Sequence, residues 1–443
     1  MNCITHATHR PLSRLGRAFI PVLVSLFVIG IWLAPSALCA KPAESASTQS
    51  KSKVKGKSKS RASQSAKESQ GTKPNPDALI SAIYMDLAAA RLRPALTKAD
   101  SLVDAYPNFR LGHLIRGDLL MMHARPVTNF GATQDQTPDN KLQDLRSEVM
   151  VRLKMGHQKP DPDLFPRAFT QLRDDHKYAV LIDTKQSRLF LYANRNGKLS
   201  LLNHYYISQG KLGINKLREG DQKTPIGIYR ITGRIARDKL PDFYGSGALP
   251  LNYPNDWDRV HGRGGSGIWL HGMPSDSFSR PPLASDGCVA LTNPDLTELA
   301  SILDIYKTLV VISDRVELVN AKVWNADRKT AAQMLEKWRR DVEYGNRNQI
   351  LKQYSEKFRS SANEDLKTWA EKQYPENTNA NVSLKIRDVS LMRYPGHPNM
   401  VAAAFKLDIQ SGKITSQTRR YQLWEKDGKS WKIVYENTIK DFL

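Results

Sequence analysis

The chain has 443 residues, of which 40% are hydrophobic and 25% are charged. This composition is typical of a soluble globular protein that buries a core, and the length favours two to three domains. Lysine and arginine number 66 against 44 acidic residues, which gives a formal net charge of +22. Beyond one run near the N-terminus, no stretch is long and apolar enough to span a membrane, which excludes a multi-span membrane protein.

Residues 1–40 have the pattern of an export signal. Three arginines precede an apolar run over 18–33, and small residues near Ala40 offer a cleavage site. We expect this segment to direct the protein to the periplasm and to be removed near Ala40. An uncleaved membrane anchor is the alternative, because the apolar run is only slightly short for a membrane span.

Cleavage there would remove Cys3 and Cys39 and leave Cys288 as the one cysteine of the mature chain. Cysteines in oxidising compartments are usually paired in disulfides, and a single cysteine has no partner within its own chain. An unpaired thiol in that setting is a candidate reactive group.

Residues 41–75 are rich in Lys, Ser, Ala and Gln and have almost no apolar side chains. Such a segment cannot offset the entropy cost of ordering, so we expect a disordered basic linker. Its lysines could also attract anionic lipid or glycopolymer. Export excludes nucleic acid as a partner, and no aromatic residues interleave with the lysines as a single-strand-binding surface requires.

Residues 76–160 are expected to be helical, because apolar residues recur there at spacings of three and four. The run A-L-T-K-A-D-S-L-V-D-A-Y-P-N-F from Ala95, followed by G-D-L-L-M, resembles one tetratricopeptide-type hairpin, a fold used for contact with partners. One repeat cannot bury a core alone. Two interpretations therefore stay open: a partner-binding surface, or a helical arm that packs on the next domain.

The hydrophobic period changes at Lys177, where short apolar runs predict strands. The expected strands are 178–182, 188–192, 199–208, 228–231, 268–270 and 308–312, with a short helix at 296–303. Residues 238–265, rich in Tyr, Pro, Gly and Asn, are expected to form a long loop that walls one side of a cleft. Tyr253 in this loop is a candidate substrate contact, with packing in the wall as the alternative.

The stretch from Gly267 to Asn293 carries the residues best suited to catalysis. A cysteine is a good acyl acceptor only as a thiolate, and a neighbouring imidazole is the usual group that takes its proton near neutral pH. A loop rich in Pro, Ser and Gly separates His271 from Cys288 and could bring the base to the nucleophile. Gly287 permits a tight turn before Cys288, whose backbone amides could face the oxyanion of a tetrahedral intermediate.

Two ordered motifs resemble the signature of the YkuD-type L,D-transpeptidases, bacterial enzymes that act on peptidoglycan stem peptides. One is H-G followed, after a loop, by S-x-G-C-V-x-L, and the other is G-D-x-x-T-P-x-G-x-Y at 220–229. The resemblance implies a compact, mostly-β catalytic sandwich over 177–314. It also implies Cys288 as the nucleophile, His271 as its base, and the backbone carbonyl of Gly272 as the group that orients the imidazole.

Further roles are expected from the same resemblance. Ser285 and Gly287 are expected to shape the oxyanion turn. Contact with substrate is expected from four residues in or near the motifs and the loop: Trp269, Asp286, Thr224 and Tyr253.

Two positions depart from the family pattern. Many members carry His before the Gly-Cys pair and Arg two residues after the cysteine, whereas this chain has Asp286 and Ala290. The missing arginine leaves open how the substrate carboxylate is held and which acceptor is used. An anionic Asp286 beside the thiol would raise the pKa of the thiol, so we expect Asp286 to point away or to pair with a cation such as Arg280.

Residues 328–443 are expected to form an α+β domain. The pattern predicts helices at 330–344, 350–358 and 366–374 and strands at 382–389, 400–409, 419–425 and 431–437. This order, with W-R-R-D-V-E-Y-G-N and a terminal W-K-I-V-Y-E-N, resembles the SnoaL-like cone fold, which often forms a pocket or a dimer face. We interpret it as a binding or assembly module. A protein partner for this domain or for the helical region stays open, as does a homodimer.

The expected architecture is multidomain, with a tetratricopeptide-like helical region, a mostly-β YkuD-type sandwich and an α+β cone-type domain. The resemblance implies cleavage of the diaminopimelate-D-alanine bond of stem tetrapeptides and transfer of the acyl group to an amine. With water as acceptor, the enzyme is instead an L,D-carboxypeptidase, and members with both domains include enzymes proposed to trim stem peptides and set cell shape. A non-catalytic wall-binding protein is a further alternative. A zinc site from His271, Asp286 and Cys288 lacks a fourth ligand, so neither a metal nor a cofactor is expected.

Overall fold

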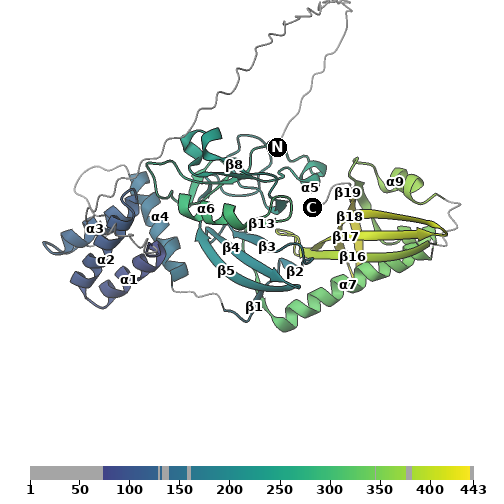
Figure 1. Cartoon of the computed structure of the whole chain (residues 1–443), viewed down its shortest axis with the longest axis horizontal. Coiled ribbons are helices and arrows are strands. Elements are labelled where there is room, and N and C mark those ends of the chain that lie inside the picture. Colours follow the sequence, from purple (N-terminus) through teal and green to yellow (C-terminus); the bar gives the residue numbers. More distant parts are fainter. Residues whose placement is uncertain are drawn as a thin grey trace, which may run out of the picture. The chain divides into compact units, whose positions relative to one another are not determined.

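The computed structural model in Figure 1 describes residues 73–127, 130–131, 139–156, 161–344, 346–375 and 382–439. The expected export signal and all but the last residues of the expected linker lie outside these ranges. Within the described ranges, no helix is both long and apolar enough to cross a membrane. Helices come first along the chain, and two regions with larger sheets follow them (Figure 1).

Four helices form the first region: α1 Pro76–Ala88, α2 Leu92–Ala105, α3 Arg110–Met122 and α4 Asp139–Gly156. Asn75 caps α1, because its side chain accepts a hydrogen bond from the backbone N–H of Ala78. Pro76 stands at the first helical position, where a backbone donor is not needed. Apolar side chains of the four helices meet in one core around Phe109. The expected helical region before the catalytic domain is confirmed.

The central sheet of the catalytic region has five strands in the order β5 Lys198–Tyr206, β4 Arg188–Arg195, β3 Tyr178–Asp183, β13 Leu309–Ser313 and β7 Gly227–Arg230. β3 and β13 are parallel, and the other neighbours are antiparallel. Nearly all side chains of β3 and β13 are buried, because both faces of these strands are covered. This explains why their sequences are continuous apolar runs without alternation.

A second sheet has the order β12 Val289–Ala290, β10 Trp269–His271, β9 Gly247–Pro250 and β8 Ile235–Ala236. Beside it, β6 Gln209–Gly210 pairs with β11 Leu283–Ser285. Apolar residues of both sheets and of helix α6 Asn293–Ile302 form one core. The expected mostly-β sandwich is confirmed.

Residues 238–265 are not the single long loop that their composition predicts. They contain most of the short helix η1 Arg237–Lys239, then η2 Asp242–Tyr244, strand β9 and helix α5 Asp256–Val260. A capping box between Asn255 and Asp258 starts α5, and β9 forms because Ala248 pairs with His271 of β10. Elements this short depend on tertiary pairing, which a local pattern does not reveal.

The C-terminal region combines helices α7 Ala321–Glu343, α8 Arg347–Leu351 and α9 Leu366–Gln373 with a six-stranded sheet. The strand order is β15 Tyr354–Ser360, β19 Ser430–Ile439, β18 Ile414–Asp427, β17 Met400–Ser411, β16 Val382–Arg393 and β2 Phe169–Gln171. The helices cover the sheet through a core that contains Trp338 and Trp424. A short pair, β1 Leu164–Pro166 with β14 Leu318–Asn320, lies before α7. The expected α+β domain is confirmed.

The helix predicted at 350–358 is wrong, because α8 ends at Leu351 and β15 begins at Tyr354. Tyr354 and Phe358 are four residues apart, which imitates one face of a helix. In the structure both side chains are buried in the domain core, and Tyr354 lies opposite Ile433 of β19. Strand pairing therefore overrides the local pattern.

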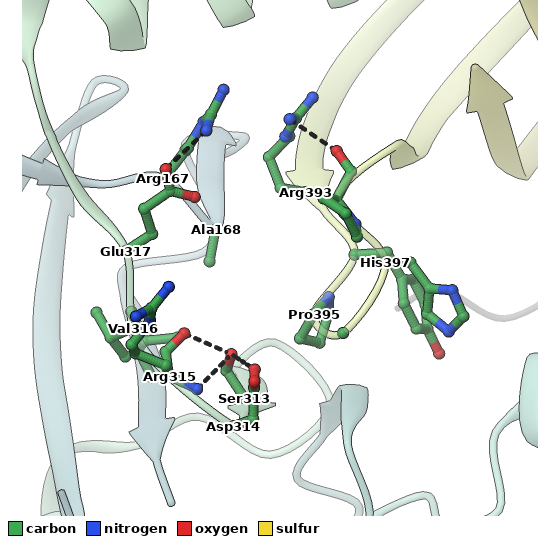
Figure 2. Close-up of a pocket in the computed structure, with 14 residues that line it drawn as sticks. Arg167, Ala168, Ser313, Asp314, Arg315, Val316, Glu317, Arg393, Pro395 and His397 are labelled. Carbon is green, nitrogen blue, oxygen red and sulfur yellow. Dashed lines mark hydrogen bonds and ion pairs between the residues drawn. The ribbon is translucent and has the colours of Figure 1, made fainter. Parts of the chain in front are cut away.

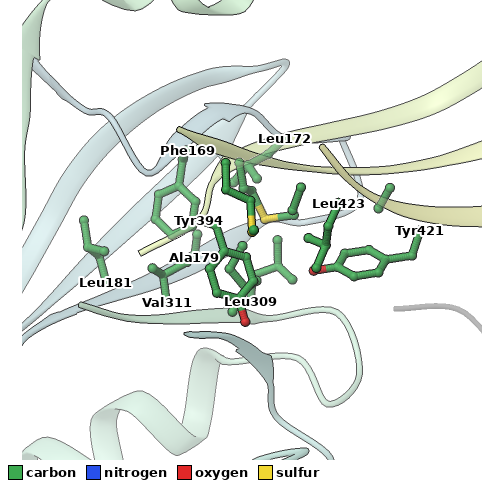
Figure 3. Close-up of a cluster of buried hydrophobic side chains, with 14 of the residues drawn as sticks. Phe169, Leu172, Ala179, Leu181, Leu309, Val311, Tyr394, Tyr421 and Leu423 are labelled. Atoms are coloured by element: carbon green, nitrogen blue, oxygen red, sulfur yellow. The ribbon is translucent and has the colours of Figure 1, made fainter. Parts of the chain in front are cut away.

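The C-terminal sheet and the central sheet of the catalytic region share a core. Leu181 and Val311 face Tyr394 and Leu423 across this core (Figure 3). Phe169 on β2 is fully buried in it, although β2 precedes the catalytic strands in sequence. The C-terminal domain is therefore held against the catalytic region by apolar packing as well as by the connecting chain.

The helical region packs on the catalytic region through the loop between β10 and β11. The ring centroid of Phe278 in this loop lies 4.5 Å from that of Tyr106 and 4.8 Å from that of Phe109. The Phe278 backbone N–H donates to the Asn108 carbonyl at 3.2 Å, and the Asn108 side chain donates to the Ser275 carbonyl at 3.1 Å. These contacts show that the helical region packs on the catalytic region, which is one of the two roles expected for it.

Buried charges form a second contact at the same boundary. The side chain of Arg152 is 1% exposed and pairs with Asp77 at 2.5 Å and with Glu148 at 2.9 Å. Asp77 also pairs with Arg188 of β4 at 2.6 Å, and Glu148 accepts a hydrogen bond from the Ser279 hydroxyl at 2.6 Å. These contacts connect α1 to β4, and α4 to the loop that leads towards Cys288.

Candidate active site

The register of two parallel strands brings Cys288 and His271 together. Leu270 of β10 lies opposite Val289 of β12, and His271 lies opposite Ala290. Continued back by one residue, this register sets Cys288 beside Trp269. Side chains alternate along a strand, so Trp269, His271 and Cys288 point to the same face. The pairing of β10 with β12 thus brings together two residues that a loop separates in sequence.

His271 is buried, and its Nδ1 lies 2.7 Å from the carbonyl oxygen of Gly272. A carbonyl only accepts hydrogen bonds, so Nδ1 carries the proton and Nε2 is left as the acceptor. Burial lowers the pKa of His271 to about 4, and the charge of Arg280 acts in the same direction. The imidazole is therefore neutral near pH 7 and able to take a proton.

Cys288 is half-buried, and its Sγ donates a hydrogen bond to the Gly267 carbonyl at 3.1 Å. Burial raises the pKa of the thiol, while the backbone N–H of Trp269 and the charges of Lys216 and Arg280 act to lower it. The resting pair is thus a neutral thiol and a neutral imidazole. Within the described part of the chain, the thiol makes no hydrogen bond to His271.

The turn before Cys288 is held by two hydroxyl groups. Ser285 Oγ donates to the Cys288 carbonyl at 2.6 Å and accepts from the Gly287 N–H at 3.1 Å. Thr224 Oγ1 donates to the Gly287 carbonyl at 3.1 Å and accepts from the Gly210 N–H at 2.9 Å. The Thr224 hydroxyl therefore connects the G-D-x-x-T-P motif to the turn before Cys288, so that residues of both motifs hold the same turn.

Gly287 is required by its own geometry. Its φ of +123° lies in a region that side chains disfavour, and an added Cβ would stand 2.8 Å from the carbonyl oxygen of Lys223. The close approach of the Lys223 backbone leaves room for glycine only.

Aromatic rings surround the imidazole. Tyr244 lies edge-on to His271, with ring centroids 5.2 Å apart, and 5.0 Å from Trp269. Phe243, also in η2, stacks near His271 at 5.9 Å and is 45% exposed. The guanidinium of Arg280 lies over the Phe243 ring at 4.4 Å. The sequence analysis missed Phe243 and Tyr244; the aromatic content of the expected wall was the available indication.

Three of the expected substrate contacts are placed as follows. Thr224 has no exposed surface, and Tyr253 is 6% exposed with its hydroxyl donating to the Gly264 carbonyl at 2.9 Å. Asp286 is exposed and pairs with Lys211 at 3.0 Å and with the Gln222 amide at 3.1 Å. Asp286 therefore has a cationic partner, but not Arg280. The fourth expected contact, Trp269, lies half-buried beside the thiol.

Asp221 organises the loop that approaches the cysteine, and the sequence analysis gave it no role. Its carboxylate accepts from three backbone amides, of Leu217, Arg218 and Lys223, at 2.7 to 3.2 Å. It also pairs with the buried Lys216 at 2.8 Å. These hydrogen bonds lower the pKa of Asp221 against the opposing effect of burial. Its place at a specified position of the G-D-x-x-T-P pattern was the indication that could have identified it.

Two cavities lie away from these residues, where the catalytic region meets the C-terminal sheet. One of about 320 Å³ is lined by Arg167 and Glu317 on one side and by Arg393 and His397 on the other (Figure 2). Another, of about 290 Å³, is lined by residues that include Arg230. Neither is lined by Cys288 or His271. In the described residues, no group of three or more His, Cys, Asp or Glu side chains is placed to hold a metal ion.

Comparison with protein families agrees with this geometry. Residues 177–312 match the model of the YkuD L,D-transpeptidase catalytic domain, and residues 330–437 match that of the Cds6 C-terminal NTF2-like domain. The chain carries a YkuD-type L,D-transpeptidase domain. The NTF2-like match confirms the expected cone-type fold of the C-terminal region.

Individual relatives match parts of the chain. YafK of Escherichia coli strain K12, which has a provisional L,D-transpeptidase name, is 31% identical over 122 residues, or 27% of this chain. The chain covers only 44% of the length of that relative. The structure of Bd1075 from Bdellovibrio bacteriovorus aligns with a TM-score of 0.55 and 25% identity, over 62% of this chain and 98% of that one. Pgp2 from Campylobacter jejuni, described as a helical cell shape determining protein, aligns with a TM-score of 0.53 and 26% identity, over 61% and 95%.

Proposed function

We propose that the protein is a periplasmic L,D-transpeptidase in which Cys288 is the nucleophile and His271 its general base. The substrate is a peptidoglycan stem tetrapeptide, and the bond cleaved joins diaminopimelate to D-alanine. The observation that carries this proposal is the strand register that sets Cys288 on the same face as His271, whose Nδ1 is bonded to the Gly272 carbonyl at 2.7 Å. The free Nε2 is then the atom that accepts the thiol proton.

The steps follow from the neutral resting pair. The thiol turns away from the Gly267 carbonyl, and Nε2 of His271 takes its proton as Sγ attacks the peptide carbonyl. The imidazolium gives that proton to the D-alanine amine, which leaves, and a thioester to Cys288 remains. An amine from a second stem attacks the thioester, His271 removes the proton gained by that amine, and the proton returns to the thiolate. The product is a 3,3 cross-link.

Supporting roles go to residues that hold the turn. We assign Thr224 and Tyr253 to positioning instead of the substrate contact expected from sequence, because both are buried and bonded to backbone carbonyls. Ser285 and Gly287 shape the turn. The Gly287 N–H is bonded to Ser285 Oγ, so it becomes an oxyanion donor only if that bond opens.

Hydrolysis is the second candidate, with water in place of the amine. Ala290 favours it, because this fully buried residue lies opposite His271 and supplies no cation for a second peptide. The likeness to Pgp2, a cell shape determining protein, is consistent with trimming of stem peptides. The product would be a tripeptide and free D-alanine.

Mass spectrometry of purified disaccharide-tetrapeptide incubated with the mature protein distinguishes the candidates. A 3,3-linked dimer identifies a transpeptidase, and a tripeptide identifies a carboxypeptidase. Cys288→Ala should abolish either product, and the wild type trapped early should carry an acyl mass on Cys288. If neither product nor adduct forms, the enzymatic proposal fails for this substrate, and a non-catalytic wall-binding role takes its place.

A further inference from the structure

Arg280 is a charged side chain at the candidate active site that forms no ion pair with a carboxylate of the described residues. It is half-buried, and its guanidinium lies 4.4 Å from the centroid of Phe243, the ring that stacks near His271. Among the described residues, no carboxylate lies within ion-pair distance of it. Burial lowers the pKa of Arg280, and the charges of Asp286, Asp276 and Cys288 offset this effect only in part. A bound carboxylate would provide the missing compensation.

Two lysines near the cysteine turn, Lys211 and Lys216, already have acidic partners. Lys216 is bonded to Asp221 at 2.8 Å, and Lys211 is bonded to Asp286 at 3.0 Å. Position 290, two residues after the cysteine, holds a buried alanine. Unlike these two lysines, Arg280 is available for an anionic ligand.

The backbone of Arg280 is held in place before any ligand arrives. Its carbonyl accepts a hydrogen bond from the Tyr206 hydroxyl at 2.8 Å. The preceding residues are fixed by the helical region, through the Ser279 bond to Glu148 and the packing of Phe278. A binding group on a fixed loop loses little conformational entropy when its ligand docks.

We propose that Arg280 binds the terminal carboxylate of the D-amino acid that leaves the stem peptide. This inference rests on the proposed function. His271 protonates the leaving amine, so the leaving residue lies on the His271 side of the thiol, and Phe243 places the guanidinium on that side. The carboxylate is one carbon from the leaving nitrogen, within reach of a bidentate contact. Arg280 would thus select peptides that end in a free D-amino acid.

The test compares two substrates in two proteins. Disaccharide-tetrapeptide ending in a free carboxylate and its C-terminal amide are offered to the wild type and to Arg280→Gln, and kcat/KM is measured for release of the terminal residue. We expect Arg280→Gln to lose about 10- to 100-fold on the acid and less than about threefold on the amide. Arg280→Lys should recover part of the loss on the acid, because charge remains without the bidentate geometry.

Controls separate the inference from the proposed function. Arg237→Gln, at an exposed arginine 3.7 Å from Asp242, should behave as wild type on both substrates. If the wild type cleaves the acid but Arg280→Gln matches it, or loses equally on acid and amide, the inference is overturned while the proposed function stands. If amidation of diaminopimelate, instead of D-alanine, removes the effect of the substitution, the assigned carboxylate is wrong. A wild type without turnover or acyl adduct refutes the proposed function itself.

Discussion

Two parts of the candidate active site are built on different principles. The turn that carries Cys288 is held by short bonds among the motifs, from the Ser285 and Thr224 hydroxyls to backbone groups at 2.6 to 3.1 Å. The part with Phe243 and Arg280 instead consists of exposed or half-buried side chains. The loop that leads to Arg280 is held by the helical region, which is distant in sequence.

This difference suggests that substitutions can affect the catalytic step at the cysteine turn separately from substrate binding at Arg280. Bonds within the motifs leave the cysteine turn little freedom, so a change there should alter the catalytic rate. The loop of Arg280 depends on packing between regions, so a change in the helical region should alter stability and substrate binding first. Substitutions in each part should therefore give different signatures.

The largest effect is expected at the contact of the helical region. Arg152→Ala removes the cation between Asp77 and Glu148 and leaves the Glu148 carboxylate buried without a positive partner. The free energy of unfolding should fall by about 3–5 kcal/mol, measured by urea denaturation followed through tryptophan fluorescence. Arg116→Ala is the matched control, because its pair with Asp100 is 44% exposed on both sides and should contribute about 0–1 kcal/mol. Equal losses in the two variants would contradict the structural role given to Arg152.

The next effect is expected in the cysteine turn. In Gly287→Ala, the new Cβ meets the Lys223 carbonyl oxygen at 2.8 Å at a φ of +123°, so the turn must shift. Strain of about 1–3 kcal/mol should appear as a roughly 10- to 100-fold fall in kcat. Gly197→Ala is the control, because that glycine also has a positive φ, +78°, but nothing lies within 4 Å of the added Cβ. A kcat that falls as far in the control would show that a positive φ is sufficient for the effect and that the contact with the Lys223 carbonyl does not explain it.

The same division explains what could be predicted from the sequence. Cys288 and His271 stand in motifs with a recognisable order, and the strands that carry them are apolar runs. Their common face follows once β10 and β12 pair in register. The residues of the turn lie close together in sequence and therefore form a recognisable motif. The helical region and the cone-type domain are likewise recognisable, because the hydrophobic spacing of their helices and strands is a local pattern.

The recognition part leaves no such pattern. The place of Phe243 depends on η2 lying against β10, and that of Arg280 on a loop whose Phe278 enters the core of the helical region. The partner of Asp286 is Lys211, a residue brought near by the pairing of β6 with β11. Such contacts arise only when distant segments fold together, so spacing along the chain does not predict them.

A smaller effect is expected from the hydroxyl that joins the two motifs. Thr224→Val keeps the shape of the side chain but leaves the Gly210 N–H and the Gly287 carbonyl without their partner. The free energy of unfolding should fall by about 1–3 kcal/mol, and kcat should fall with it, because the turn before Cys288 loosens. Thr224→Ser retains the hydroxyl and should recover most of the activity. Both quantities are measured on the same preparations, and a serine variant as impaired as valine would point to lost packing instead of lost hydrogen bonds.

The smallest effect is expected in the pH dependence of kcat/KM, which tests whether the charge of Arg280 influences the pKa of His271. Burial lowers the pKa of His271 to about 4, so kcat/KM should stay level as pH falls through 6.5 and decline only near pH 4, where the imidazole gains a proton and stops accepting one from the thiol. The charge of Arg280 contributes to that lowering, so Arg280→Gln should raise the acid limb by less than about one pH unit. The pH profiles are measured with the amide substrate, which lacks the carboxylate that Arg280 is proposed to bind. The shift of the acid limb then reports only the electrostatic effect of Arg280 on His271. An acid limb near 6.5 in the wild type would mean that the imidazole is hydrated in the free enzyme. An unshifted limb in Arg280→Gln would mean that the charge of Arg280 does not influence the pKa of His271.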